Sequence, residues 1–285
     1  SSIGLIYALK KVLINIYRYM SLQKHLNNLK LNGITVIKNV FSKKKCEDYI
    51  RRSELLFSKL LRKKKVNTFS NFTQMINSPF QYDNFFFQQV YFSKIDKILT
   101  KLLDRNYVLI NTNLINHKIF SHPNIKNLNS KNKRVPSPVY NSEWHTDSRY
   151  LGGKRVGRGL SYIVTIPLDD FNLENGTRYI PKSHHSDKIP KRNANYKHKV
   201  LTPKKGDLVI FDSGLWHKAG NATIKGRWSI FNYYGPWWMK PYFMYDQMLG
   251  KRKINNLSVN IKRMLHFYSS PPKNDHIRTH TVVKY

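Results

Sequence analysis

The chain has 285 residues, of which 40% are hydrophobic and 13% aromatic, enough apolar side chains to bury one large core. Its single cysteine, Cys46, excludes a disulfide framework and a cysteine-based metal site, and it favours a reducing, cytoplasmic setting. The formal net charge of +34 predicts an anionic partner: a phosphorylated or carboxylated small molecule, or an anionic membrane surface. Lysine bias in a genome would give the same charge, and no motif for nucleic-acid binding accompanies it, so nucleic acid is not the expected partner.

The N-terminal third is expected to be a helical flank with one early strand. Apolar residues from Ile3 to Met20 recur at helical spacing, which predicts an amphipathic helix packed on the domain or lying on a membrane surface. The run is too short to span a bilayer and lacks the cleavage site of a secretory signal. A short strand is predicted over Gly33 to Ile37, and Ser42 is expected to cap a helix that ends near Lys65.

Strand patterns dominate the centre of the chain. Helical spacing returns at Phe85 to Leu103, and Tyr107 to Ile110 begins a β-rich region. Residues 121–138 lack periodicity and are rich in Asn, Lys, Ser and Pro, which predicts a loop able to cover a pocket. Further strands are expected at Leu160 to Leu168, Thr177 to Ile180, Leu208 to Phe211 and Arg227 to Tyr234, with Asn175-Gly176 predicting a hairpin between the first two.

Short strands separated by turns predict a mainly β fold with flanking helices, a sandwich or jelly roll. We expect one catalytic domain over residues 1–285. Residues 1–105 form its helical flank, 106–235 its β core and 236–285 a C-terminal extension with a helix near Asn260 to Phe267.

Two segments carry residues suited to metal chemistry. His145 and Asp147 are two residues apart, so on an extended strand both side chains project from one face. His217 follows a predicted turn and strand, and would complete a set of two imidazoles and one carboxylate. Such a set holds iron(II) with positions open for a bidentate 2-oxoacid and dioxygen. Arg227 could then grip the remote carboxylate of 2-oxoglutarate, with the hydroxyls of Thr165 and Ser229 nearby.

The same segments resemble the phytanoyl-CoA dioxygenase family of iron(II)/2-oxoglutarate-dependent oxygenases. The likeness runs from about Asn32 to Tyr234 and is carried by the stretches Asn175 to His184 and Lys205 to His217. It implies a double-stranded β-helix of the jelly-roll, cupin-like type. It also implies iron ligation by His145, Asp147 and His217, and 2-oxoglutarate binding by Arg227. An amide from Asn113 or Asn111 is a further candidate contact. Where some relatives carry tryptophan near the cosubstrate, this chain has Ile163 and Thr165.

The activity implied is hydroxylation of an unactivated C–H bond in an anionic small molecule, a lipid or a sugar intermediate, free or carrier-linked. Asp147 favours hydroxylation, because related halogenases replace this carboxylate with a small residue. The alternatives are a catalytically silent jelly-roll binding protein and a metal enzyme that does not use 2-oxoglutarate. Residues that flank the ligands are the candidate substrate contacts: Trp144, Arg149, Tyr150, Arg155 and Trp216. Aromatic residues after Pro236 would suit a membrane-bound substrate, a subunit contact or the core: Trp237, Trp238, Tyr242 and Phe243.

Overall fold

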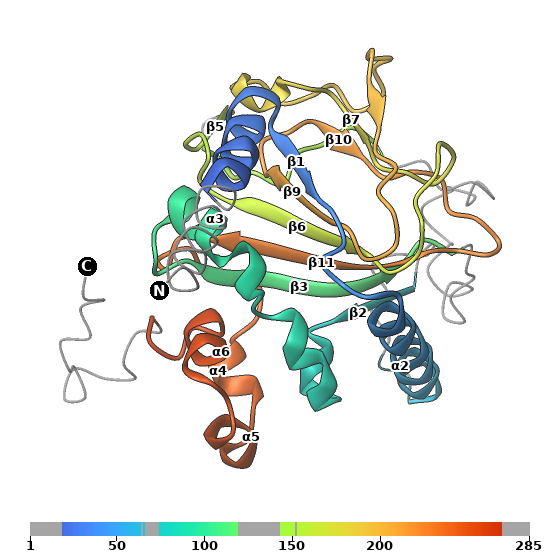
Figure 1. Ribbon diagram of the computed structural model, residues 1–285, viewed down its shortest axis with the longest axis vertical. Helices are drawn as coiled ribbons and strands as arrows, with labels where there is room; N and C mark the ends of the chain where they lie inside the picture. The colour runs from blue at the N-terminus through green and yellow to red at the C-terminus, as the bar shows by residue number, and fades with distance from the viewer. Residues whose placement is uncertain (1–18, 64, 66–73, 119–142, 152, 270–285) are drawn as a thin grey trace, which may run out of the picture.

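A computed structural model describes residues 19–63, 65, 74–118, 143–151 and 153–269. Its centre is an antiparallel sheet of six strands in the order β1-β9-β6-β11-β3-β2 (Figure 1). In that order they are Ile34–Ile37, Leu208–Asp212, Tyr162–Pro167, Trp228–Gly235, Val108–Asn116 and Gln74–Asn77. A second sheet has the order β10-β7-β8, with strands His217–Lys218, Arg178–Tyr179 and Lys199–Val200. A separate small hairpin joins β4 (Tyr150–Leu151) and β5 (Lys154–Arg155).

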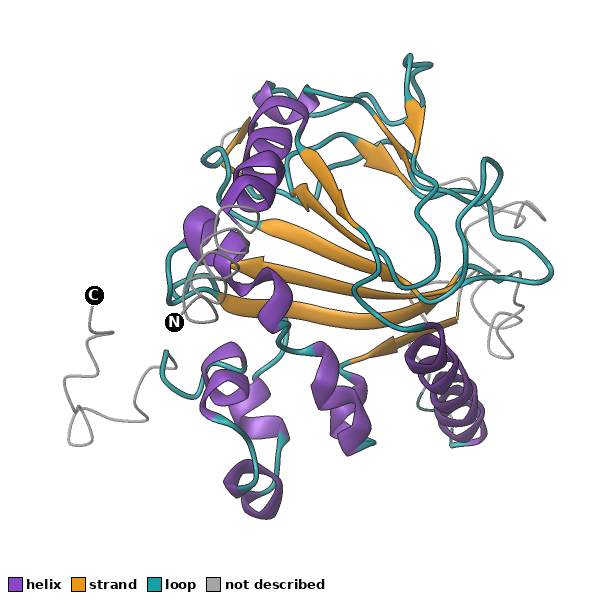
Figure 2. Ribbon diagram, in the orientation of Figure 1, coloured by secondary structure: helices purple, strands orange, loops and turns teal. Residues whose placement is uncertain are grey.

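Helices cover one side of the large sheet (Figure 2). Residues 19–32 form the described part of a helix, followed by α2 (Lys43–Arg62), α3 (Ser93–Leu103), α4 (Tyr245–Met248), α5 (Lys251–Asn255) and α6 (Val259–Met264). Short 3-10 turns lie at Pro79–Gln81, Asn84–Gln89 and Ser183–His185. No helix within the residues described here has the length and apolar content needed to cross a bilayer.

The two faces of the large sheet bury different cores. Leu109, Val164 and Ile210 pack with the helices, including Tyr49 of α2 and Leu99 of α3. On the opposite face, a second cluster joins the inward side chains of the large sheet to residues beside the small sheet: Ile163, Val209, Phe211, Tyr233, Leu201 and Leu215. The two sheets therefore enclose an interior, as in a jelly roll, and alternate residues of each strand point into it.

Most predicted elements are confirmed. The strands at Ile34 and Leu208 and the helix α6 occur close to their expected places. Ser42 caps α2 by accepting a hydrogen bond from the Lys45 amide at 3.2 Å. The segment expected to be helical from Phe85 is divided into a 3-10 turn and α3. The loop predicted at residues 121–138 and most of the helix from Ile3 lie outside the described residues.

The predicted hairpin at Asn175-Gly176 is wrong. Strand β6 before this turn belongs to the large sheet, whereas β7 after it pairs with β10 and β8. The Asn172 side chain accepts hydrogen bonds from the amides of Glu174 and Asn175, so the turn is held locally, without a partner strand. The chain therefore crosses from one sheet to the other at this turn.

Candidate active site

His145, Asp147 and His217 come together where β10 of the small sheet meets the segment that precedes β4. The backbones of His145 and His217 form an isolated antiparallel bridge, in which each amide donates to the other residue's carbonyl at 3.0 Å. One potential ligand atom from each of the three side chains lies within 4.8 Å of the others. The Asp147 Oδ2 atom is 3.5 Å from the Nε2 atom of His217. The structure thus assembles the three residues predicted as metal ligands.

Backbone carbonyls set the tautomers of both imidazoles. The Nδ1 atoms of His145 and His217 each lie 2.8 Å from a carbonyl oxygen, that of Glu143 and that of Leu215. A carbonyl can only accept, so both Nδ1 atoms carry the proton and both Nε2 atoms keep a lone pair. Burial, followed by the neighbouring His145, lowers the pKa of His217 to about 4. His217 is therefore a neutral imidazole at physiological pH, the form that binds metals.

The carboxylate of Asp147 is suited to a cation. Its Oδ2 atom is buried, and no donor among the described residues reaches it. The Asp147 Oδ2 atom and the Nε2 atom of His217, two potential ligand atoms, thus face each other at 3.5 Å. Because His145 is exposed, one side of the group remains open. Two imidazoles and one carboxylate in an open arrangement fit iron(II) with additional ligands.

The predicted 2-oxoglutarate contacts share the inner face of the large sheet. Phe231 of β11 is opposite Thr165 of β6 on one side and Asn113 of β3 on the other, so the three point the same way. Ser229 precedes Phe231 by two residues, and Tyr233 follows it by two. Because the Tyr233 hydroxyl donates to the Asp147 carbonyl at 3.1 Å, this face leads along β11 to the candidate metal ligands.

Arg227 directly precedes β11. Because it is two residues before Ser229, its side chain points to the same face of the sheet. It is 2% exposed, its guanidinium lies 3.5 Å from the ring centroid of Phe171, and its Nε atom donates to the Asn175 carbonyl at 2.8 Å. Burial lowers the pKa of Arg227 to about 9, although the negative charge of Asp169 acts in the opposite direction. Arg227 is thus still charged at neutral pH. Within the described chain its two terminal nitrogens have no acceptor, which leaves them free for a carboxylate.

Two predicted substrate contacts belong to an aromatic cluster beside the triad. Trp144 is 2% exposed and packs against Tyr196, with Lys218 lying 5.0 Å over its ring. Trp216 contacts Tyr196 at 5.4 Å between ring centroids and remains partly exposed. Trp216 can therefore face a ligand, whereas Trp144 mainly supports the cluster. Sequence reasoning overlooked Tyr196, which lies in a segment without a motif, and Lys218, which directly follows His217.

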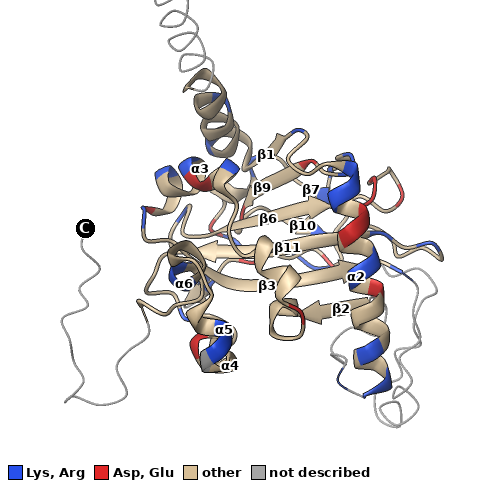
Figure 3. Cartoon of the chain, turned by 60° about the horizontal axis from the view of Figure 1, so that its bottom comes forward, with Lys and Arg blue, Asp and Glu red and all other residues tan. Residues whose placement is uncertain are grey.

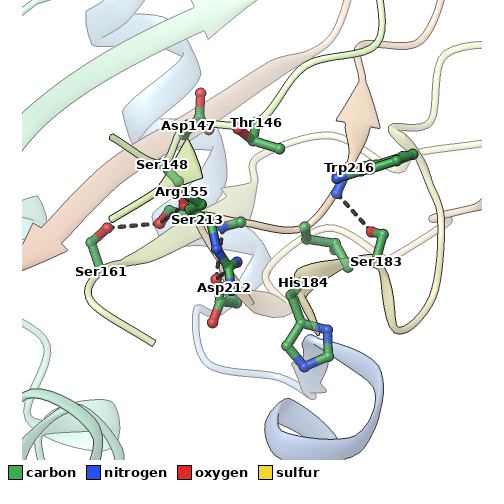
Figure 4. A network of polar contacts seen from close by, with 12 residues as sticks. Thr146, Asp147, Ser148, Arg155, Ser161, Ser183, His184, Asp212, Ser213 and Trp216 are labelled. Atoms are coloured by element: carbon green, nitrogen blue, oxygen red, sulfur yellow. Dashed lines mark hydrogen bonds and ion pairs between the residues drawn. The ribbon is translucent and has the colours of Figure 1, made fainter. Parts of the chain in front are cut away.

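The other three predicted contacts are placed differently. Arg149 lies 5.2 Å over the ring of Tyr242, and the hydroxyls of Tyr150 and Thr146 are 2.9 Å apart, so both residues flank the triad. The side chain of Arg155 is only 1% exposed and forms an ion pair with Asp212, with Nη1 3.6 Å from Oδ1. Figure 4 shows this pair beneath the segment that carries Asp147. Arg155 is packed inside the protein and does not face the open side of the site.

Known proteins resemble this chain in sequence and in fold. The sequence model of the family described as phytanoyl-CoA dioxygenase (PhyH) matches residues 29–227. Uncharacterised proteins of Mycobacterium tuberculosis (Rv1501) and Mycobacterium bovis (Mb1539) are each 28% identical over 137 residues, which cover 46% of this chain. The match covers 48% of each relative, so the chain spans about half the length of these curated relatives.

Solved structures share the fold. The epimerase SnoN, in complex with Fe3+, alpha-ketoglutarate and nogalamycin RO, superimposes with a TM-score of 0.56 at 12% identity, over 78% of this chain and 87% of SnoN. HygX from Streptomyces hygroscopicus, with nickel, 2-oxoglutarate and hygromycin B bound, gives 0.56 at 15% identity, over 77% of this chain and 89% of HygX. The jelly-roll fold predicted from the strand pattern is confirmed.

Proposed function

Because the chain belongs to the phytanoyl-CoA dioxygenase (PhyH) family, whose members are iron(II)/2-oxoglutarate-dependent oxygenases, we propose that it hydroxylates an unactivated C–H bond. The observation that carries this proposal is the triad, whose ligand atoms lie within 4.8 Å of one another. Iron(II) is the cofactor, and 2-oxoglutarate and dioxygen are the cosubstrates. Asp147 supports hydroxylation over halogenation, because its carboxylate occupies a position that halide would need.

Each residue has a proposed role in this reaction. His145, Asp147 and His217 would hold the iron, which when bound supplies oxygen activation driven by oxidative decarboxylation of 2-oxoglutarate. Arg227 would bind the remote carboxylate with its two terminal nitrogens, while stacking on Phe171 fixes the plane of the guanidinium. The inward side chains of Thr165, Ser229 and Asn113 would line the path between Arg227 and the metal.

We propose further that the substrate is anionic. Lys218 lies over Trp144 near the triad, and its pKa is lowered first by burial and then by the charge of Arg178. Two cations that repel each other would gain from an anion between them. Arg149, two residues after Asp147, adds a third cation above the ring of Tyr242. A phosphate, sulfate or carboxylate group on a lipid, a sugar intermediate or a carrier would satisfy these charges.

Peripheral contact with an anionic membrane is a further proposal, for a protein in the cytoplasm. Three side chains after Pro236 are largely exposed: Trp238 (59%), Tyr242 (50%) and Met244 (59%). The guanidinium of Arg149 lies over the ring of Tyr242. Exposed aromatic side chains next to cations favour the headgroup region of anionic bilayers. Figure 3 shows further Lys and Arg on the labelled helices, although α2 carries both signs of charge. Sedimentation with phosphatidylserine vesicles at low salt tests this contact, and no sedimentation there would refute it.

The decisive experiment is an anaerobic titration of the purified protein with iron(II) and 2-oxoglutarate. We expect the weak visible charge-transfer band of a chelated 2-oxoacid. The band should be lost in His217→Ala and weakened in Arg227→Ala, and it should persist in His185→Ala, a matched control because His185 is exposed and outside the triad. Metal binding without the band in the parent protein would favour an enzyme that does not use 2-oxoglutarate. No metal binding at all would favour a silent binding protein.

A further inference from the structure

The backbone around Asp147 is held by the turn that follows β9. The amides of Asp147 and Ser148 both donate to the carbonyl of Ser213, at 2.8 and 3.0 Å. Since no described donor holds the buried Oδ2 atom, the direction of the Asp147 carboxylate depends on how firmly its backbone is fixed. Figure 4 shows Ser213 between Ser148 and Ser161, beside the segment that carries Asp147.

Four hydroxyls connect this backbone into a closed network. The Oγ atom of Ser213 lies 3.0 Å from that of Ser148 and 2.7 Å from that of Ser161. Ser161 in turn lies 3.0 Å from the Tyr233 hydroxyl, which donates to the Asp147 carbonyl at 3.1 Å. Ser161, Ser213 and Tyr233 are all buried. The network therefore joins the start of β6, the end of β9 and β11 to both sides of one peptide segment.

The protons in this network can be arranged in only one order along the chain of hydroxyls. A carbonyl only accepts, so the single Tyr233 proton goes to Asp147, and the Tyr233 oxygen must accept from Ser161. Ser161 then accepts from Ser213, and Ser213 accepts from Ser148. A directed chain of buried hydroxyls, each polarising the next, gives the final bond to Asp147 more strength than an isolated one.

Beneath the network, an ion pair fixes the turn that carries Ser213. The Oδ1 atom of Asp212 accepts from the Gly214 amide at 2.7 Å and lies 3.6 Å from the Nη1 atom of Arg155. A Cβ atom on Gly214 would fall 1.5 Å from that nitrogen, so the guanidinium packs directly on the turn. The position of the Ser213 carbonyl is thus fixed both by the contacts of Asp212 and by the hydroxyl network.

We propose that Tyr233, supported by Ser161 and Ser213, is a positioning residue that sets the direction of the Asp147 carboxylate and hence the affinity of the triad for metal. The inference rests on the proposed function, because it requires a metal at the triad. It assigns a role to buried residues outside the triad and outside the expected 2-oxoglutarate contacts. Groups that orient metal ligands in this way commonly change metal affinity by about ten- to a hundredfold when removed.

Cobalt(II) alone, added to the full chain and followed by its visible absorption, tests this role without turnover. Tyr233→Phe should raise the Kd for cobalt(II) about tenfold and alter the band shape. Ser161→Ala should have a smaller effect, because Tyr233 can still donate to Asp147. Tyr234→Phe is the matched control, since its hydroxyl donates to the Val90 carbonyl at 3.0 Å in the helical core. Its Kd should equal that of the parent.

The outcomes separate this inference from the proposed function. If the parent binds cobalt(II) and Tyr233→Phe and Ser161→Ala bind it equally well, the positioning role is overturned while the metal site stands. If Tyr233→Phe and Tyr234→Phe weaken binding equally, the effect is general destabilisation and the role is again overturned. A parent that does not bind cobalt(II) overturns the proposed function and this inference with it. Should Tyr233→Phe not fold, Ser161→Ala alone decides.

Discussion

His145 and His217 face each other twice, through two backbone hydrogen bonds of 3.0 Å and through rings whose centroids are 4.3 Å apart. The bridge that joins the segment before β4 to β10 therefore also supports the two imidazoles proposed as metal ligands. Since the backbone bonds do not involve the rings, replacing either imidazole should remove a ligand and leave the bridge in place. This separation of scaffold from ligand makes single substitutions informative.

Arg227→Lys is expected to weaken 2-oxoglutarate binding while metal affinity stays unchanged. Lysine keeps a charge, but it loses the planar fork that lies on Phe171. Loss of one charge-assisted hydrogen bond costs about 1.5–3 kcal/mol, equivalent to a roughly ten- to hundredfold rise in Kd. Titration of the charge-transfer band measures the change. Arg158→Lys, at an exposed ion pair with Asp187, is the control, and an equal Kd in both variants would contradict the role of Arg227.

Gly214→Ala should destabilise the protein. Its Cβ would collide with the buried guanidinium of Arg155, which has little room to move. Overpacking of this kind typically costs about 1–3 kcal/mol. Urea unfolding monitored by tryptophan fluorescence gives the free energy of unfolding. Gly250→Ala provides the comparison, because no atom lies within 4 Å of its added Cβ and its φ of −69° suits alanine. Equal stability of the two variants would disprove the close packing on Arg155.

Stability should fall as the pH is lowered below about 6.5, partly through His266. Burial lowers the pKa of this imidazole below its ordinary value of 6.5, although a hydrogen bond to the Leu109 carbonyl opposes the shift. Above pH 6.5 the ring is neutral in both the folded and the unfolded chain. As the pH falls from 6.5 toward the lower pKa of the folded state, the unfolded chain binds the proton first. The free energy of unfolding therefore decreases until the pH has passed the folded pKa.

Replacing His266 with phenylalanine isolates this contribution. The free energy of unfolding, measured between pH 7.5 and about 5, should fall less steeply in His266→Phe than in the parent. His185→Phe removes an exposed imidazole and should leave the slope unchanged. Parallel slopes for parent and His266→Phe would show that His266 does not contribute to the acid sensitivity.

Cys46 should be unreactive toward thiol reagents until the protein unfolds. Cys46 lies on the buried face of α2, its side chain is inaccessible to solvent, and burial raises the pKa of the thiol to about 11. The reactive thiolate is therefore scarce at pH 8, and reagents cannot reach it. Labelling with a chromogenic disulfide should be slow in buffer and complete within seconds in guanidinium chloride. Rapid labelling of the folded protein would place Cys46 in a more open setting.

The sequence predicted the elements whose signals are local. Ser42 caps α2 because its hydroxyl reaches an amide three residues away, and the turn at Gly206 is required by a φ of +83°. Ser229 was expected near Arg227, and period-two alternation puts these two residues on one face of the strand. The same alternation extends to Tyr233, and would have identified it as an inward residue.

Long-range partners could not be predicted. Asn175-Gly176 has the composition of a hairpin turn, yet the flanking strands belong to different sheets, a fact fixed by packing alone. Arg155 was expected to face the substrate because of its position near the ligands in the sequence. Its burial follows from Asp212, which is 57 residues away and has no sequence signal linking the two. Roles of the individual site residues remain predictions that the titrations above decide.

Strand β3 contains a β-bulge opposite β11. Tyr233 pairs with Asn111, whereas the next residue, Tyr234, pairs with Leu109, so one residue of β3 has no partner in β11. The surplus residue is Ile110, whose carbonyl accepts the Tyr242 amide at 3.0 Å and the Tyr245 hydroxyl at 3.2 Å. The C-terminal segment is therefore attached to β3 at a bulge, and its Tyr242 packs under Arg149 beside the triad. A change in that segment could therefore alter the surroundings of Arg149 while the three residues of the triad stay the same.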